Sequence, residues 1–237
     1  TTFVYNGDGL NQGGSMSALA LDNTSGHLPH IIFRNTDGAI RHAWMECPGA
    51  CSWYYEAVDS AVDASGTNIG FAIDTSNVLH VVYHDGITDT MYYRKKTGGV
   101  WSGATNLGYG IEPSLTVSSS GLPAIAYLTT HALMYAYSNG SAWNFATIYD
   151  ESGSGKYAGF PSLKLNGGMS DQPVISFIDG DGHLSLAYAG GMDPCPGATG
   201  YDCEIRDSTS TYKTVTSLAM TDSGLRSMIY MDAITGG

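Results

Sequence analysis

The chain contains five copies of one short sequence pattern, and this repetition constrains its fold more than any other feature. Each copy has an alternating apolar run, a turn rich in Gly, Ser or Asp, and a second apolar run that ends in an aromatic residue. The second runs carry equivalent marks separated by 50, 44, 50 and 53 residues, at Pro29, Leu79, Pro123, Pro173 and Arg226. A repeat of this length predicts one supersecondary unit per copy, which cannot bury its apolar faces alone.

Two further strands complete each predicted unit. A third apolar run follows the second in four copies, and Trp53, Trp101 and Trp143 open a fourth run. Alternation with a period of two, interrupted by turn residues, predicts antiparallel β-structure throughout. A four-stranded sheet has two faces to cover, so neighbouring sheets must cover one another around a ring. We therefore predict an all-β protein, a five-bladed β-propeller of four-stranded antiparallel blades.

The predicted propeller is a single domain over residues 1–237. Its repeats are expected at approximately 15–64, 65–110, 111–157 and 158–214, with the last blade built from 215–237 and 1–14. In this arrangement Thr2 to Tyr5 form a strand of the last blade, which the N- and C-terminal strands share. The fifth repeat has no written third strand, so either this blade has three strands or the sequence lacks residues of the natural protein. The first alternative is favoured, because a missing strand leaves backbone groups unpaired.

Composition limits the partners of such a protein. The formal net charge of −12 disfavours nucleic acid and anionic membranes as partners. No stretch approaches 18 consecutive apolar residues, so no membrane span is expected.

The four cysteines are informative through their spacing. Cys47 and Cys51 fall in one connection between a third and a fourth strand, and Cys195 and Cys203 fall in another. Two cysteines within one hairpin loop favour a local disulfide, and a shared zinc site is the alternative. Disulfides would place the protein in an oxidising setting, extracellular or periplasmic.

The repeats also resemble those of known proteins. The architecture resembles the five-bladed β-propellers of the tachylectin-2-like lectins, and the rhythm Ser-Gly-Leu-Pro-x-Ile-Ala-Tyr of residues 120–127 resembles repeats of secreted bacterial propeller proteins. The resemblance covers nearly the whole chain but is one of architecture. It implies a lectin-like role, and fold analogy alone is an associational argument for function.

Acidic residues gather in the connections predicted to lie at one face. Asp85, Asp179 and Asp181 are ligand-binding candidates, and Asp179 and Asp181 are also candidates for a Ca²⁺ site. The alternative is turn chemistry, because Asp-Gly pairs are favoured in hairpins. No cofactor is expected otherwise, and Ca²⁺ is the one candidate.

Histidines form a second constellation at that face, at His84, His131 and His183. These three could bind a transition metal, but equivalent propeller loops are far apart and polar surface histidines are the favoured interpretation. His30 and His80 occupy equivalent positions in the second runs and are interpreted as packing residues.

Aromatic residues separate into recurrent and non-recurrent positions. Recurrent ones, such as Trp53, Trp101, Trp143 and the aromatic residue that ends each second run, are interpreted as structural. The ligand-binding candidates are those that break the repeat, because binding residues are often carried on connections of a rigid scaffold. They are Tyr109, Tyr157, Phe160 and Tyr201.

Motifs of enzymes are absent from the sequence or incomplete. Residues 152–156 suggest a P-loop but lack two required positions, and no Gly-x-Ser-x-Gly elbow occurs. We therefore predict a secreted, non-catalytic recognition module, with a carbohydrate bound by inter-blade or top-face loops. The alternatives are a scaffold for protein interaction or adhesion, with an extracellular protein partner, and a glycan hydrolase with a carboxylate-lined central funnel.

Overall fold

The computed structural model describes residues 13–60, 68–153, 156–190, 193–208, 213–221 and 224–232. The chain divides into two compact units, residues 1–111 and 112–237. Among the described residues the helical content is one 3-10 turn, η1 (Gly167–Met169), and no helix is long and apolar enough to cross a membrane.

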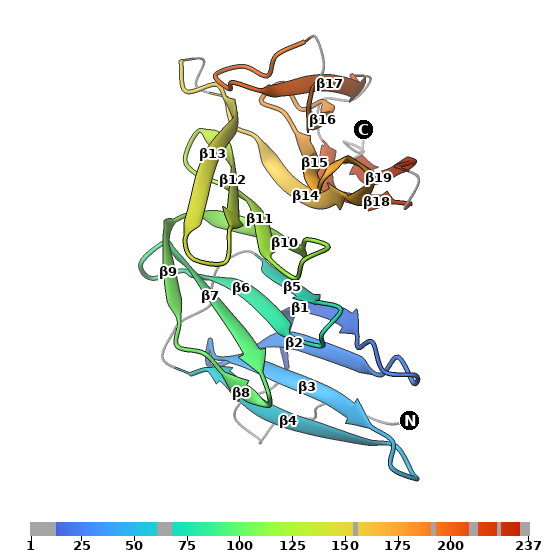
Figure 1. Ribbon diagram of the computed structural model, residues 1–237. Helices are drawn as coiled ribbons and strands as arrows, with labels where there is room; N and C mark the ends of the chain where they lie inside the picture. Colours follow the sequence, from blue (N-terminus) through green and yellow to red (C-terminus); the bar gives the residue numbers. More distant parts are fainter. Residues whose placement is uncertain are drawn as a thin grey trace. The chain divides into compact units, whose positions relative to one another are not determined.

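The first unit contains two antiparallel sheets (Figure 1). The first sheet follows chain order: β1 (Gly13–Leu21), β2 (Pro29–Asn35), β3 (Ile40–Glu46) and β4 (Ser52–Asp59). The second sheet has β5 (Ile69–Ile73), β6 (Leu79–Asp85), β7 (Thr90–Thr97), β8 (Val100–Trp101) and β9 (Thr105–Tyr109). Strands β8 and β9 both pair with β7. The fourth strand predicted at Trp101 is therefore interrupted and forms two short strands.

The second unit contains three antiparallel sheets, which are green to red in Figure 1. The first has β10 (Ile111–Val117), β11 (Pro123–Leu128), β12 (Ala132–Ser138) and β13 (Trp143–Asp150). The second has β14 (Gly159–Asn166), β15 (Gln172–Ile178), β16 (Leu184–Ala189) and β17 (Tyr201–Asp207). The third pairs β18 (Lys213–Met220) with β19 (Arg226–Asp232).

The prediction of an all-β protein built from four-stranded antiparallel sheets is confirmed. The number of blades, the single domain and the repeat limits stay predictions. The strand expected at Thr2 to Tyr5 lies outside the described residues.

Neighbouring sheets within each unit bury the alternating apolar runs against one another. In the first unit Ile32 and Ile40 of the first sheet form one core with Val81 and Tyr83 of the second sheet. In the second unit Val174 and Leu186 pack against Leu218 of β18. In both pairs the two sheets therefore bury apolar side chains against each other, as the repeat pattern requires.

The serine that opens several repeats joins neighbouring sheets in the second unit. The backbone N–H of Leu163 in β14 donates to Ser114 Oγ in β10, at 3.0 Å. The backbone N–H of Leu218 in β18 donates to Ser162 Oγ in β14, also at 3.0 Å. A small hydroxyl residue at this repeat position thus satisfies an amide of the next sheet.

A left-handed residue precedes this serine by two positions in three repeats. The φ angles are +52° at Glu112, +52° at Phe160 and +59° at Val215. The pairing register shifts next to Phe160 and Val215, so these residues lie in β-bulges. A positive φ is unusual for a residue with a Cβ, and for β-branched Val215 it is strained.

Both predicted disulfides are present and local. Cys47 pairs with Cys51 in the β3–β4 connection, and Cys195 pairs with Cys203, which already belongs to β17. The aromatic residues that end the second runs are buried in four repeats, whereas Tyr230 of the fifth is 37% exposed. The buried four are Phe33, Tyr83, Tyr127 and Phe177.

Candidate functional site

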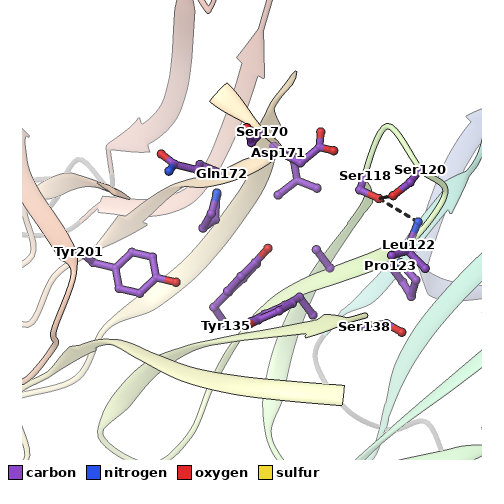
Figure 2. Close-up of a pocket in the computed structure, with 14 residues that line it drawn as sticks. Ser118, Ser120, Leu122, Pro123, Tyr135, Ser138, Ser170, Asp171, Gln172 and Tyr201 are labelled. Carbon is purple, nitrogen blue, oxygen red and sulfur yellow. Dashed lines mark hydrogen bonds between the residues drawn. The ribbon is translucent and has the colours of Figure 1, made fainter. Parts of the chain in front are cut away.

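A cleft lies in the second unit, between the β10–β13 sheet and the β14–β17 sheet. Its volume is about 360 Å³, and we call it the tyrosine cleft after Tyr135, Tyr137 and Tyr201. Its polar rim consists of Ser118, Ser120, Ser138, Ser170, Asp171 and Gln172. Figure 2 shows Tyr135 and Tyr201 on one side of the cleft, opposite Asp171 and Gln172.

The three tyrosines offer ring faces and hydroxyl groups to this cleft. The Tyr135 and Tyr137 rings stack with centroids 5.4 Å apart, and Tyr137 is 40% exposed whereas Tyr135 is buried. Burial raises the pKa of Tyr135 and of Tyr201, with a further contribution from neighbouring tyrosines. These two hydroxyl groups therefore keep their protons at neutral pH, and each can donate and accept a hydrogen bond.

Hydrogen bonds between two turns fix the rim of the tyrosine cleft. Asp171 Oδ2 accepts from Ser119 N at 3.0 Å and from Ser119 Oγ at 2.6 Å, which joins the β14–β15 turn to the β10–β11 turn. Within the β10–β11 turn, Leu122 N donates to Ser118 Oγ (Figure 2). The mouth of the cleft is therefore organised before any ligand binds.

A smaller cleft lies in the first unit, between the β1–β4 sheet and the sheet of β5–β9. Its volume is about 180 Å³, and we call it the histidine cleft. Its lining consists of His30, His42, Trp44, Asn77, Leu79, Lys96, Gly98 and Gly99.

A chain of polar contacts runs beneath the histidine cleft. His30 Nδ1 lies 2.9 Å from His42 Nε2, and His42 Nδ1 lies 2.8 Å from Glu56 Oε1. Burial opposes the charge of Glu56, but hydrogen bonds from His42, Lys96 and Trp101 lower the pKa of this carboxyl group to about 2. Because Glu56 is a carboxylate, the proton of His42 is assigned to Nδ1, and His30 Nδ1 donates to His42 Nε2.

The imidazoles of His30 and His42 are both uncharged at pH 7. Burial, followed by the neighbouring His42, lowers the pKa of His30 to about 4. Burial also lowers the pKa of His42, although Glu56 pulls it in the opposite direction. His30 was expected to be a packing residue, and its side chain is 14% exposed. It packs and also takes part in the hydrogen-bond chain.

The two clefts occupy equivalent positions in the repeat, as the strand registers show. His30 pairs with Trp44 and Ala124 pairs with Tyr137, so Trp44 and Tyr137 correspond. Further corresponding pairs are His42 and Tyr135, Trp101 and Tyr201, Lys96 and Ala189, and Asn77 and Asp171. The hydrogen bond between neighbouring turns also recurs. Asn77 Oδ1 accepts from Asn23 N at 2.7 Å, as Asp171 Oδ2 accepts from Ser119 N in the tyrosine cleft.

A third cleft, of about 340 Å³, gathers acidic residues at the other end of the second unit's strands. Asp179, Asp181, Glu151 and His183 line it together with Tyr149. Asp179 Oδ1 accepts from the backbone N–H groups of Asp181 and His183, and its Oδ2 accepts from Ser185 Oγ. Asp181 pairs with Lys156 at 2.6 Å.

Ca²⁺ takes six to eight oxygen ligands, and each carboxylate oxygen of Asp179 already accepts at least one hydrogen bond. The described part of the chain contains no group of three or more His, Cys, Asp or Glu residues able to hold a metal ion. A requirement for calcium stays a prediction.

The remaining predicted ligand residues are dispersed. Asp85 is buried and accepts from Ile87 N and Thr88 Oγ1 of its own turn. Tyr109 ends β9 in the first unit and is exposed, whereas Tyr157 stacks on His131. Phe160 occupies the β14 bulge, where its N–H donates to Glu112 Oε2.

The sequence also predicts His84 and His183 on the same face as His131. In the structure His84 lies 3.2 Å from Asp89, and His183 lies 3.3 Å from Asp179. Each thus has a carboxylate of its own turn as neighbour.

Comparisons place the fold among solved structures. No protein-family model and no curated protein sequence matches the chain. The SapL1 lectin, solved in complex with alpha methyl fucoside, is similar in structure with a TM-score of 0.62 and 14% sequence identity, over 87% of this chain and 70% of that chain. The fold is a β-propeller.

A second solved structure is also similar. AofleA from Arthrobotrys oligospora is similar with a TM-score of 0.55 and 12% identity, over 94% of this chain and 84% of that chain. A form of AofleA with three arginines replaced by alanine gives the same TM-score at 11% identity. The resemblance to propeller lectins at the level of architecture is thereby confirmed.

The sequence pattern identifies one of the three tyrosines of the tyrosine cleft and misses the other two. Tyr201 is a predicted ligand residue and it lines the cleft, although the strand register gives it the position of the recurrent Trp101, so it does not break the repeat. Tyr135 and Tyr137 were not singled out, since they read as part of a regular third strand. The signal that could have found them is the aromatic pair at alternate positions of the third strand, which also appears as His42 and Trp44.

Proposed function

We propose that the chain is a secreted, non-catalytic recognition module that binds a neutral carbohydrate in the tyrosine cleft. The observation that carries the proposal is the convergence of Tyr135, Tyr137 and Tyr201 with a hydroxyl-rich rim in one preformed cleft. Its volume of about 360 Å³ lies within the range of small-molecule sites. Sugars place C–H faces on aromatic rings and hydroxyl groups on polar atoms, and this cleft offers both partners.

The similar solved structures support the ligand class. SapL1 was solved with a methyl glycoside, which is a small neutral sugar of the size expected here. Because a shared fold is a weak argument for a shared function, the proposal depends on the tyrosines of this chain. The two disulfides support the secreted location, since such bonds persist in oxidising compartments.

A glycan array tests the proposal first, with and without Ca²⁺, followed by calorimetry on each glycan that binds. Substitutions Tyr201→Phe and Tyr135→Phe each remove one hydroxyl group and keep the ring. Each should weaken binding of the selected glycan by about tenfold, the equivalent of one lost hydrogen bond of roughly 1.4 kcal/mol.

Tyr109→Phe is the matched control, because Tyr109 is an exposed tyrosine of the first unit, outside the tyrosine cleft. Binding that falls in Tyr109→Phe and is unchanged in Tyr201→Phe would move the site away from the tyrosine cleft. An array without any bound glycan would contradict the proposal and direct the search to protein partners. Release of free sugar from a bound glycan would instead favour a hydrolase.

A further inference from the structure

The histidine cleft holds a cation supplied by the chain itself. Lys96 Nζ lies 4.8 Å from the ring centroid of Trp44 and 6.0 Å from that of Trp101. The same ammonium donates to Glu56 Oε1 at 2.5 Å. The Lys96 side chain is 12% exposed, so its charge is largely removed from water.

Two aromatic faces and a carboxylate are the elements of an ammonium-binding cage. An ammonium group within about 6 Å of a tryptophan centroid is attracted by the ring, and more strongly when it is desolvated. The carboxylate of the cage is held in place independently of Lys96, because Glu56 Oε1 also accepts from His42 Nδ1 and from Trp101 Nε1 at 2.9 Å. The cage is thus organised by groups other than its occupant.

The equivalent position in the tyrosine cleft lacks this occupant. Lys96 pairs with Trp101 across the β7–β8 hairpin, and Ala189 pairs with Tyr201 in the same way between β16 and β17. Alanine places one methyl group where lysine places four methylene groups and an ammonium. The volumes agree with this difference, at about 180 Å³ for the histidine cleft and about 360 Å³ for the tyrosine cleft.

We propose that Lys96 is the built-in occupant of a cation cage formed by Trp44, Trp101 and Glu56, and that it closes the histidine cleft to external ligands. Lys96 then determines which of two equivalent clefts is available, and the ligand class of the emptied cage is a small primary ammonium ion. The statement about available clefts rests on the function proposed above for the tyrosine cleft, whereas the cage can be tested without it.

The experiment is a chemical rescue of Lys96→Ala. This substitution removes the atoms of n-propylammonium, so n-propylammonium chloride is the probe, with 1-propanol as the uncharged control and potassium chloride as the ionic control. Trp44 and Trp101 lie at the cage, so tryptophan fluorescence reports binding and calorimetry gives the stoichiometry. We expect Lys96→Ala to bind one propylammonium at least tenfold more tightly than the unchanged protein, and 1-propanol to have no such effect.

Two variants make the result specific. Lys95→Ala removes the same charge from the neighbouring, exposed position of β7 and should leave propylammonium binding at the level of the unchanged protein. The double variant Glu56→Gln/Lys96→Ala removes the carboxylate of the cage and should lose the gained affinity. If Lys96→Ala has a lowered Tm, propylammonium must raise it and 1-propanol must not, because a ligand stabilises the state that binds it.

Two results would overturn the proposal: a Lys96→Ala protein whose propylammonium affinity and Tm respond no more than those of the unchanged protein, or propylammonium binding that survives in the double variant. The residues of the tyrosine cleft all belong to the second unit, so glycan binding is measured independently of propylammonium binding. Absence of glycan binding in every variant would contradict the proposed function while the rescue still decides the role of Lys96.

Discussion

Acidification should destabilise the protein through His30, and the size of this effect follows from its surroundings. The unfolded imidazole takes up a proton near its usual pKa of about 6.5, whereas burial and the facing groups His42 and Lys96 lower the folded pKa to about 4, against the opposing pull of Asp22 and Glu56. Between these two values the unfolded chain binds more protons, so the free energy of unfolding falls as the pH falls. A difference of about 2.5 pKa units at about 1.36 kcal/mol each gives a loss of roughly 3 kcal/mol.

The assay is urea unfolding followed by tryptophan fluorescence, at a series of pH values between 7 and about 4. His30→Asn keeps an N–H donor for His42 Nε2 but does not titrate. Over this pH range its free energy of unfolding should therefore fall by roughly 3 kcal/mol less than that of the unchanged protein. His27→Asn is the control, because His27 is exposed and its left-handed φ of 44° suits asparagine. Parallel pH profiles for the unchanged protein and His30→Asn would refute the reasoning.

Four further substitutions, at three positions, test single structural features by their effect on the free energy of unfolding. Ser162→Ala should cost about 1–2 kcal/mol because it leaves the N–H of Leu218 without its acceptor, and a loss within error would show that water replaces the hydroxyl group. Val215→Asn should stabilise by about 1 kcal/mol, since asparagine tolerates the φ of +59° and the valine side chain is exposed; a decrease in Tm would contradict the strain. Asp59→Ala should cost about 3–5 kcal/mol because it removes the carboxylate 2.6 Å from Arg94, and Asp59→Asn, which keeps an acceptor, should cost less.

The sequence predicts the strands well because their signal is local. Alternation, turn residues and the small residue that opens each repeat are all visible without knowledge of neighbours. The pairs Cys47–Cys51 and Cys195–Cys203 are predictable for the same reason, since the two cysteines of each pair are only four and eight residues apart. The roles of Ser114 and Ser162 were not, because each acts on an amide of the next sheet, about 50 residues away.

The site was harder to predict because it depends on strand register and on side-chain length at one position. Whether Lys96 or Ala189 faces the corresponding aromatic residue decides the size of a cleft, and no local pattern marks this position. The sequence locates the carboxylates of the turns, but it does not show whether they bind a ligand or stabilise the turn. Asp85 and Asp179 accept hydrogen bonds from their own turns, and a turn preference in the sequence looks the same as a ligand preference.

The serine contacts between sheets have a consequence for hydrogen exchange. The amide protons of Leu163 and Leu218 are held by hydroxyl groups of a neighbouring sheet. Fraying of a single strand edge does not by itself release them, whereas separation of two sheets exposes both. In an exchange experiment these two amides therefore report how often adjacent sheets part, and the ladder amides beside them report the opening of each sheet.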